Sequence, residues 1–379
     1  MNKPLAGVRV LDLSRILAGP WCTQHLADFG AEVIKIEHPQ RGDDTRKWGP
    51  PFWQDSEQSA YFLCANRGKQ SMVVDIATPE GQQRIRELAV TSDVVVENFK
   101  VGGLKRYGLD YESLKAINPK LIYCSITGFG QNGPDKDKLG YDFLLQGRGG
   151  LMSITGQGDE HPGGGPVKVG VAVVDLFTGM YASTSILSAL HGRQHTGEGC
   201  HIDISLLDVQ VATLANQATN FLTSGQSPQR IGNEHPNIVP YQAFATSSGH
   251  MIVAVGNDAQ FERFCRVIDC EALLDDARFS SNRGRVQHRG ELIPLLEMAM
   301  HQRSSEEWIA LFNQHGVPCG PINNIEQVFD DPQIQYRGMK LNLKHPEYGE
   351  VALVGNPVRM NGISQNSTIA PPLHGQDKL

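Results

Sequence analysis

The segment Val8–Glu37, VRVLDLSRILAGPWCTQHLADFGAEVIKIE, decides the fold class. Within it, Val8–Leu13 is a short apolar run that is typical of a buried strand. Ala18–Phe29 has the composition of a helix, and Gly30 follows as a C-terminal stop signal. Glu32–Glu37 predicts a second strand. A strand, a helix and another strand in this order are typical of a parallel sheet of the Rossmann kind.

The same alternation continues through the next part of the chain. Further strands are expected at Ser71–Ile76, Asp93–Glu97 and Leu121–Thr127. Helices are expected between them at Pro79–Val90, where Pro stands at a helix start, and at Tyr111–Ile117. The sequence therefore predicts an α/β protein whose large domain is a Rossmann-like parallel sheet.

A second, smaller domain is expected because 379 residues are too many for one simple core. Tyr241–Thr246 and His250–Val255 flank Ser-Ser-Gly and predict a hairpin. Helical patterns follow at Ala259–Ile268 and Ser305–His315, and Gly316–Pro321 (GVPCGP) is expected to be irregular. The predicted division is a large domain at 1–200 completed by 330–379, a linker helix at 201–224, and a small α+β domain at 225–325.

The turn after the first predicted strand tests whether the sheet binds a dinucleotide. That function needs a G-x-G-x-x-G pattern, because its glycines let the backbone approach a pyrophosphate. Residues 14–20 read SRILAGP instead. Glu37 ends the second strand, where a ribose-binding acid would lie, but the glycines are missing. We therefore expect no NAD.

Composition argues against several broad classes of function. The formal net charge of −7 disfavours a broad nucleic-acid surface. The seven cysteines form no CxxC pair, and His191, His195 and His201 lie in the wrong context for zinc, so no metal is expected. We find no signal-peptide pattern and no run of about 18 apolar residues. The expectation is a cytoplasmic protein without nucleic-acid or membrane partners.

Gly170–Ala182 (GVAVVDLFTGMYA) contains the first candidate for chemistry. A strand-like run is expected to end at Asp175, and an apolar helix to continue from there to about His191. Asp175 would then be an N-cap whose carboxylate accepts backbone N–H groups. The same position suits a nucleophile, because the helix dipole would keep the carboxylate ionised and nearby N–H groups would stabilise an oxyanion. The pattern alone leaves both interpretations open.

Three polar loops are candidates for binding phosphates. Glu97–Gly108 and Thr127–Asp142 each follow a predicted strand, and Gly42–Pro50 is a polar turn. Their cations of interest are Lys100, Lys105 and Arg106 in the first loop, Lys136 and Lys138 in the second, and Arg46 in the third. Each loop is equally compatible with a solvated surface segment.

Together these segments resemble the family III CoA-transferases, also called the CaiB/BaiF family, over nearly the whole chain. The matching motifs occur in register, and they are VRVLDLSRILAGP, GAEVIKIEHP, GDDTRKWGPPF, VVVENF, SITGFGQNGP, GYD, VGVAVVDLFTGMYA, VPYQAF and GVPCGPINN. The resemblance implies a large Rossmann-like domain, a small domain and an interlocked homodimer. It also implies coenzyme A, bound as an acyl-CoA substrate, and small carboxylic acids as partners.

The resemblance implies catalytic roles for three residues. Asp175 matches the family nucleophile, and Tyr141 and Asp142 match polar residues that support it. In the implied reaction Asp175 attacks the donor acyl-CoA and forms a mixed anhydride and free CoA thiolate. The thiolate then forms an aspartyl-CoA thioester, and the acceptor acid finally takes the CoA.

Five further residues are expected to bind CoA. Asn98 and Arg106 match residues that line the CoA groove in the family, and Arg106 is suited to a phosphate. Ala18 matches a backbone contact to CoA. Lys138 and Arg67 complete the predicted set.

The closest resemblance within the family is to succinyl-CoA:dicarboxylate CoA-transferases that act on glutarate or hydroxymethylglutarate. The second carboxylate of such an acid would require an Arg, and Arg15 and Arg46 are the candidates. Oxalate–formate members carry Gln in place of Leu17 and Arg in place of His38, and a four-glycine loop that this chain lacks. That substrate pair is therefore not expected.

Two alternatives follow from the same pattern. An acyl-CoA racemase of this fold would move a proton beside the thioester with an acid–base pair. Racemases carry His at the position of Tyr141, and Tyr is a far poorer base at neutral pH. The other alternative is a non-catalytic protein that binds acyl-CoA, with Asp175 acting only as a cap.

Overall fold

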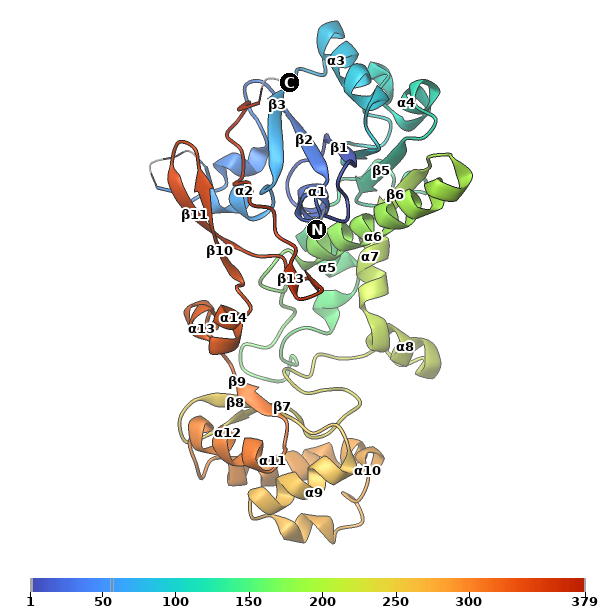
Figure 1. Ribbon diagram of the computed structural model, residues 1–379. Helices are drawn as coiled ribbons and strands as arrows, with labels where there is room; N and C mark the ends of the chain where they lie inside the picture. Colours follow the sequence, from blue (N-terminus) through green and yellow to red (C-terminus); the bar gives the residue numbers. More distant parts are fainter. Residues whose placement is uncertain (1–2, 55, 57, 378–379) are drawn as a thin grey trace. The chain divides into compact units, whose positions relative to one another are not determined.

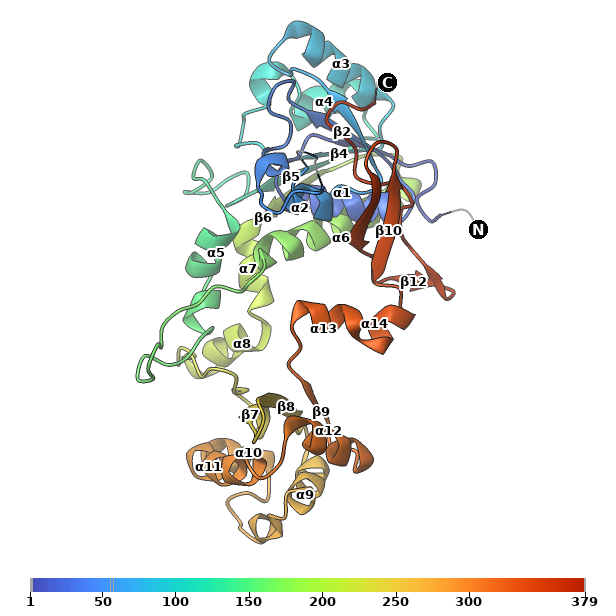
Figure 2. The same cartoon turned by 90° about the vertical axis from the view of Figure 1, so that its left-hand side faces the viewer.

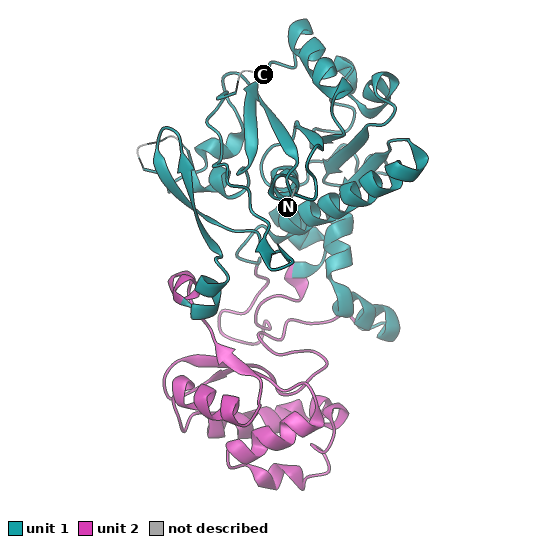
Figure 3. Ribbon diagram, in the orientation of Figure 1, with its two compact units in different colours: residues 1–151, 168–226, 331–379 teal, residues 152–167, 227–330 magenta. Residues whose placement is uncertain are grey.

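The computed structural model describes residues 3–54, 56 and 58–377. The chain forms two compact units, shown in Figure 3. Unit 1 comprises residues 1–151, 168–226 and 331–379, and unit 2 comprises residues 152–167 and 227–330. Each unit has its own hydrophobic core.

Unit 1 is built on a six-stranded sheet in which every pair of neighbouring strands is parallel. The strand order is β3-β2-β1-β4-β5-β6. The strands are β1 (Arg9–Asp12), β2 (Glu32–Glu37), β3 (Lys69–Val73), β4 (Val94–Glu97), β5 (Ile122–Thr127) and β6 (His201–Ser205). The order reverses between β1 and β4, which is the doubly wound arrangement. The predicted α/β class and Rossmann-like sheet are confirmed.

Helices cover both faces of the sheet in unit 1 (Figure 1). On one face, α1 (Ala18–Asp28) and α6 (Val173–Thr196) pack on each other and share a core cluster with alternate residues of β1 and β4. On the other face, α3 (Pro79–Val90) and α4 (Tyr111–Ile117) share a second cluster with the remaining alternate residues. Apolar residues on both faces of each inner strand explain why these strands read as continuous apolar runs.

A glycine allows α1 and α6 to approach closely. A Cβ added at Gly179 would lie 2.7 Å from the carbonyl oxygen of Ala18. Ser183, one turn further along α6, donates its hydroxyl to the carbonyls of Gly179 (2.9 Å) and Cys22 (3.2 Å). By length and composition alone, α6 also has the hydropathy of a helix that could cross a membrane, a test that core helices pass as well.

Two sequence expectations about unit 1 are corrected by the structure. The segment before Asp175 forms no strand, since α6 begins at Val173 and continues to Thr196. Residues 201–224, expected to be a linker helix, start with strand β6 and continue as α7 (Leu206–Thr213) and α8 (Ala215–Ser224). The strand-like alternation of HIDIS is only five residues long, so it gives a weak signal.

The remaining elements of unit 1 surround the sheet and include the C-terminal segment. They are η1 (Asp44–Lys47), α2 (Ala60–Cys64), η2 (Lys105–Tyr107), α5 (Asp142–Arg148), α14 (Pro332–Tyr336), and the hairpins β10 (Lys340–His345) with β11 (Gly349–Val354) and β12 (Arg359–Met360) with β13 (Ile363–Ser364). Figures 1 and 2 show the C-terminal segment lying beside β3. The N–H of Ser71 in β3 donates to Asp377 (2.8 Å), which ties this segment to the sheet.

Unit 2 is a small α+β unit. The hairpin of β7 (Tyr241–Ala245) and β8 (His250–Ala254) lies where the sequence predicts it. Cys319–Pro321, expected to be irregular, forms a third strand, β9, antiparallel to β8. Pro is tolerated there because β9 is an edge strand, where a missing donor leaves no ladder bond unmade. The helices of this unit are α9 (Asp258–Val267), η4 (Glu271–Leu274), α10 (Asn282–Gln287), α11 (Arg289–Met300), α12 (Ser305–Gln314) and α13 (Ile325–Asp330). Along the chain, the turn η3 (Leu151–Ser153) begins with the last residue of the first segment of unit 1 and continues into unit 2.

Candidate active site

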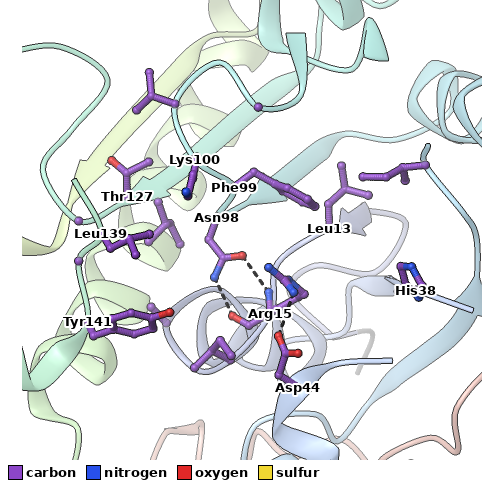
Figure 4. Close-up of a pocket in the computed structure, with 18 of the residues that line it drawn as sticks. Leu13, Arg15, His38, Asp44, Asn98, Phe99, Lys100, Thr127, Leu139 and Tyr141 are labelled. Carbon is purple, nitrogen blue, oxygen red and sulfur yellow. Dashed lines mark hydrogen bonds and ion pairs between the residues drawn. The ribbon is translucent and has the colours of Figure 1, made fainter. Parts of the chain in front are cut away.

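A pocket of about 1130 Å³ opens in unit 1 at the carboxyl ends of the parallel strands. Its walls come from the segments that follow β1, β2, β3, β4 and β5, and Asp175 of α6 also lines it. Because β1 and β4 flank the point where the strand order reverses, this is the crevice in which open α/β sheets bind their ligands. Figure 4 shows Arg15, Asn98, Lys100 and Tyr141 around this space.

The loop after β1 is held by the side chain of Asn98. The amide of Asn98 accepts a hydrogen bond from the N–H of Arg15 (2.9 Å) and donates one to its carbonyl (2.7 Å), as drawn in Figure 4. The next residue, Ile16, has a φ of +73°, which a β-branched residue rarely adopts. Such strain persists only where the surroundings enforce it, and it is often found at functional sites.

Buried ion pairs support this loop from below. Lys35 pairs with Asp43 (2.8 Å) and donates to the carbonyl of Ser14 (2.9 Å), while Lys69 pairs with Asp12 (3.1 Å). All four charged side chains are fully buried. Burial opposes the charge on Lys35, but Asp43, Asp12 and Glu37 outweigh it and raise the pKa of that ammonium. For Lys69 the balance is the reverse, because burial outweighs the attraction of Asp12 and lowers the pKa of that ammonium to about 8.

Asp142, rather than Asp175, caps the start of α6. One carboxylate oxygen of Asp142 accepts hydrogen bonds from the N–H groups of Val174 (2.8 Å) and Asp175 (3.4 Å), and the other accepts from the Gln146 amide (2.6 Å). Asp175 is the third residue of the helix, and among the described residues no hydrogen-bond donor contacts its carboxyl group. The expectation that Asp175 is the N-cap is wrong, and its side chain is available to the pocket.

The environment of Asp175 raises the pKa of its carboxyl group. Burial, and then the neighbouring Asp142 charge, raise the pKa of Asp175 to about 7. The helix dipole was expected to keep this carboxylate ionised, but burial outweighs that effect. A carboxyl group with a pKa near 7 is charged in half of the molecules at neutral pH, and desolvation makes the charged form more reactive.

Tyr61 of α2 lies near this centre and was not predicted from the sequence. Burial raises the pKa of Tyr61 to about 12, and the charges of Asp175 and Asp142 contribute to that rise. The ring of Trp48, which lines the pocket, packs edge-on against Tyr61, with 5.1 Å between centroids. The motif GDDTRKWGPPF did not indicate Tyr61, because the residue follows it in a separate short helix.

Tyr141 and Lys138 come from the loop after β5. Tyr141 is 56% exposed, lines the pocket and in Figure 4 directs its hydroxyl toward the Arg15–Asn98 pair. Lys138 lines the pocket and forms an ion pair with Asp135 (2.6 Å). The ends of this loop meet at two glycines, since a Cβ at Gly128 would lie 2.6 Å from the Cα of Gly140.

Several other cations line the pocket without a described ion-pair partner. They are Arg41, Lys100, Arg106 and Lys136. Arg106 lies over the ring of Tyr107, with 4.5 Å from its guanidinium carbon to the ring centroid. Ala18, Leu17 and His38 also line the pocket, and Ala18 is the first residue of α1. Unpaired cations beside a helix N-terminus suit a polyanionic ligand.

Two predicted binding residues do not reach the pocket. Arg46 is buried and is bound on two sides by Glu37, with 2.8 and 2.6 Å between the nitrogen and oxygen atoms. Arg67 is buried and is held in the same way by Asp28 (2.9 and 2.5 Å), with a further bond to the Val354 carbonyl. Both guanidinium groups are therefore occupied by buried carboxylates and are not available to a ligand. Arg15, by contrast, lines the pocket and pairs with Asp44 (2.9 Å).

Comparison with known proteins identifies the class of this chain. Residues 5–378 match the model of CoA-transferase family III. The chain therefore belongs to the family III CoA-transferases and is an enzyme of that class. Among the described residues, no group of three or more His, Cys, Asp or Glu side chains could hold a metal ion.

Similar proteins of known name give the comparison more detail. The chain is 50% identical over 362 residues to a succinate–glutarate CoA-transferase of Agrobacterium fabrum, covering 94% of this chain and 90% of that protein. It is 44% identical over 374 residues to the human succinyl-CoA:glutarate CoA-transferase, covering 99% of this chain and 84% of that protein. A solved structure, a CAIB/BAIF family protein from Brucella suis, has 48% identity and a TM-score of 0.87, covering 99% of this chain and 97% of that one.

Proposed function

We propose that this enzyme moves CoA from succinyl-CoA to a dicarboxylic acid, with glutarate as the first candidate acceptor. The observation that carries the proposal is the carboxyl group of Asp175, which lines a cation-rich pocket and has no hydrogen-bond donor among the described residues. The names of the similar glutarate CoA-transferases support the choice of substrates.

The proposed reaction uses Asp175 as a nucleophile in successive acyl exchanges. Its carboxylate attacks the thioester carbonyl of succinyl-CoA, the C–S bond breaks, and CoA leaves as the thiolate. The thiolate then attacks the aspartyl carbonyl of the anhydride, which releases succinate and leaves an aspartyl-CoA thioester. The acceptor carboxylate attacks this thioester, and the returning thiolate takes the acceptor acyl group and regenerates Asp175.

The residues around Asp175 support each stage of this proposal. Asp142 fixes the first turn of α6 and so sets the position of the nucleophile. Tyr141 has a hydroxyl that can donate to a developing oxyanion or to a substrate carboxylate. The pKa of the Asp175 carboxyl group is raised to about 7, so a large share of this group is ionised at neutral pH. A closed site would keep its acyl intermediates from water.

The CoA moiety is proposed to occupy the part of the pocket bordered by the loops after β1 and β4. Arg106 is placed to bind a phosphate, Asn98 orders the β1 loop, and Ala18 presents backbone at the start of α1. Lys138 is a peripheral contact. Arg15 is proposed to bind the second carboxylate of the acid, because a single bond to Asp44 leaves most of its donors free.

The assembly and compartment are also proposals. The resemblance to family III CoA-transferases implies an interlocked homodimer. Large apolar side chains of unit 1 are exposed in the single chain, including Leu222 of α8 (79%) and Tyr336 of α14 (81%). A second copy covering these residues is the expected partner. The cytoplasm is the proposed compartment, with neither membranes nor nucleic acids as partners.

A substrate matrix read by mass spectrometry tests the function. The purified enzyme is mixed with succinyl-CoA or acetyl-CoA and, separately, with glutarate, hydroxymethylglutarate, itaconate, malate, oxalate or formate. Formation of glutaryl-CoA or another dicarboxylyl-CoA from succinyl-CoA supports the proposal. If no acid accepts CoA from either donor, the transferase proposal fails, and exchange of the α-proton of a 2-methylacyl-CoA in D₂O then tests the racemase alternative.

Replacement of the nucleophile is the companion experiment. Asp175→Asn is expected to lower turnover by at least about a thousandfold, since an amide cannot form the anhydride. Asp159→Asn, an exposed carboxyl of unit 2, is the matched control and should keep full activity. Full activity of Asp175→Asn would remove the assignment of the nucleophile.

A further inference from the structure

Glu97 is a buried carboxyl group that takes no part in the proposed chemistry. It ends β4 with 6% exposure and forms no ion pair with a described residue. Its carboxylate accepts a hydrogen bond from the N–H of Phe99 (2.7 Å), two residues further along the chain. The bond fixes the backbone where β4 turns into the loop that borders the pocket.

Glu97 belongs to a row of polar side chains across three strands. In the sheet register, Glu97 is opposite Ser125 of β5, and Ser125 is opposite Asp203 of β6. The Ser125 hydroxyl hydrogen-bonds to Glu97 and lies 3.0 Å from Nε2 of His201. A hydroxyl has one proton, so when Ser125 donates to the Glu97 carboxylate, His201 must donate to Ser125.

Two members of this row hold the two loops that follow their strands. Glu97 binds the N–H of Phe99, next to Asn98, which in turn clamps the main chain of Arg15. Asp203 accepts a hydrogen bond from the N–H of Gln131 (3.0 Å), in the loop that carries Tyr141. Asn98, Phe99 and Tyr141 all line the pocket.

We infer that Glu97 is a positioning residue for acyl-CoA binding, which sets the β4 loop, and through Asn98 the Arg15–Ala18 backbone, in the geometry that receives CoA. The inference rests on the proposed CoA site. A buried carboxylate with no cation beside it lowers the stability of the fold. We therefore explain the presence of Glu97 by the loop backbone that it fixes and not by a contribution to folding stability.

The groups that face Glu97 make its charge sensitive to pH. They are Ser125 and Tyr123 of β5, Asp203 and His201 of β6, and the Phe99 N–H. Burial raises the pKa of Glu97 to about 7, with Asp203 adding to the rise and the bonds from Ser125 and Phe99 opposing it. Because the folded pKa exceeds the unfolded one, this group weakens the fold as pH rises above the unfolded pKa. The full cost is reached above about pH 7, where the bond to Phe99 is strongest.

The test is CoA binding by the full chain, measured by calorimetry at pH 6 and pH 8, together with melting temperature. In Glu97→Gln the side chain keeps its shape and an acceptor for Phe99 but loses its charge. We expect about tenfold weaker CoA binding than wild type at pH 8, no difference between the two proteins at pH 6, and a higher melting temperature than wild type at pH 8. The change in succinyl-CoA turnover should lie in KM rather than in kcat.

Two further variants keep the test decisive. Glu87→Gln, an exposed change on α3, should match wild type in every measurement. Ser125→Ala should weaken CoA binding at pH 8 less than Glu97→Gln does, because it removes only the hydrogen bond from Ser125 to Glu97 and leaves the carboxylate that binds Phe99. A Glu97→Gln protein that binds CoA like wild type at pH 8, or that melts lower at both pH values with unchanged CoA binding, overturns the inference. Because CoA binding is measured without an acceptor acid, a failure of the transferase proposal would be seen separately.

Discussion

Two walls of the pocket differ in how they are fixed. The β1 wall, residues 13–18, is mostly buried and is held by the Asn98 clamp and by the buried pair Lys35–Asp43. The β5 wall, residues 128–141, is mostly exposed and is held at its ends, by the close approach of Gly128 and Gly140 and by Asp203. The β1 wall is therefore fixed by the core, while the β5 wall takes its shape from a few surface contacts.

The largest expected difference between the walls is in stability. Lys35→Met leaves Asp43 buried without its cation, so it should lower the free energy of unfolding by about 3–5 kcal/mol. Lys136→Met on the β5 wall should change it by about 0.5 kcal/mol or less. Urea denaturation followed by circular dichroism measures both. Equal effects of the two substitutions would remove the distinction between the walls.

The next effect concerns the end of the β5 wall, where Asp142 and Asp175 meet. Asp175 reacts as the carboxylate and its pKa is raised to about 7, so single-turnover rates should fall about tenfold per pH unit below pH 7 and level off above pH 8. Asp142→Asn removes a neighbouring charge and should move this profile to lower pH. A profile that is flat from pH 5.5 to 8, or one that Asp142→Asn leaves in place, would contradict this interpretation of the pair.

The Asn98 clamp gives the third effect. Asn98→Ala removes two hydrogen bonds to Arg15 and frees the strained Ile16, so KM for succinyl-CoA should rise about tenfold, which corresponds to about 1.4 kcal/mol. Steady-state kinetics at saturating acceptor measures this change. Asn118→Ala, which also removes side-chain bonds to backbone carbonyls but lies outside the pocket, is the control for a general loss of stability.

The smallest effect is expected from the exposed cation of the β5 wall. Lys138 is already paired with Asp135 at the surface, so Lys138→Ala should raise KM for succinyl-CoA only about two- to threefold. The effect should shrink further in 0.5 M salt, because exposed charges are screened. A larger effect that persists in high salt would show that this wall closes on the ligand and excludes solvent.

The fold was accessible from the sequence because its signals are local. Apolar runs at β1, β2, β4 and β5, with a helix following β1, were sufficient to predict a parallel sheet. Strands β6 and β9 were missed because each is short and lies at a sheet edge, where the apolar pattern is weakest.

The site was accessible only in part, because partners far apart in sequence decide it. Asp175 could be named from its segment and the family resemblance, but its cap is Asp142, on a different helix. Arg46 and Arg67 were predicted to bind ligands, but in the fold Arg46 pairs with Glu37 and Arg67 pairs with Asp28. No pattern within one segment shows which carboxylate an arginine meets, so burial and pairing had to come from the structure.

The glycine neck of the β5 wall has a consequence for how this enzyme class can vary. Gly128 and Gly140 bring the two ends of the loop together with no room for a side chain, so the loop is closed off from the sheet at its base. Because its ends are held together, we expect the segment between the two glycines to tolerate exchanges of exposed residues better than the glycines themselves do. The neck thus separates an exposed part of the pocket wall, which includes Lys136 and Lys138, from Tyr141 and the start of α6.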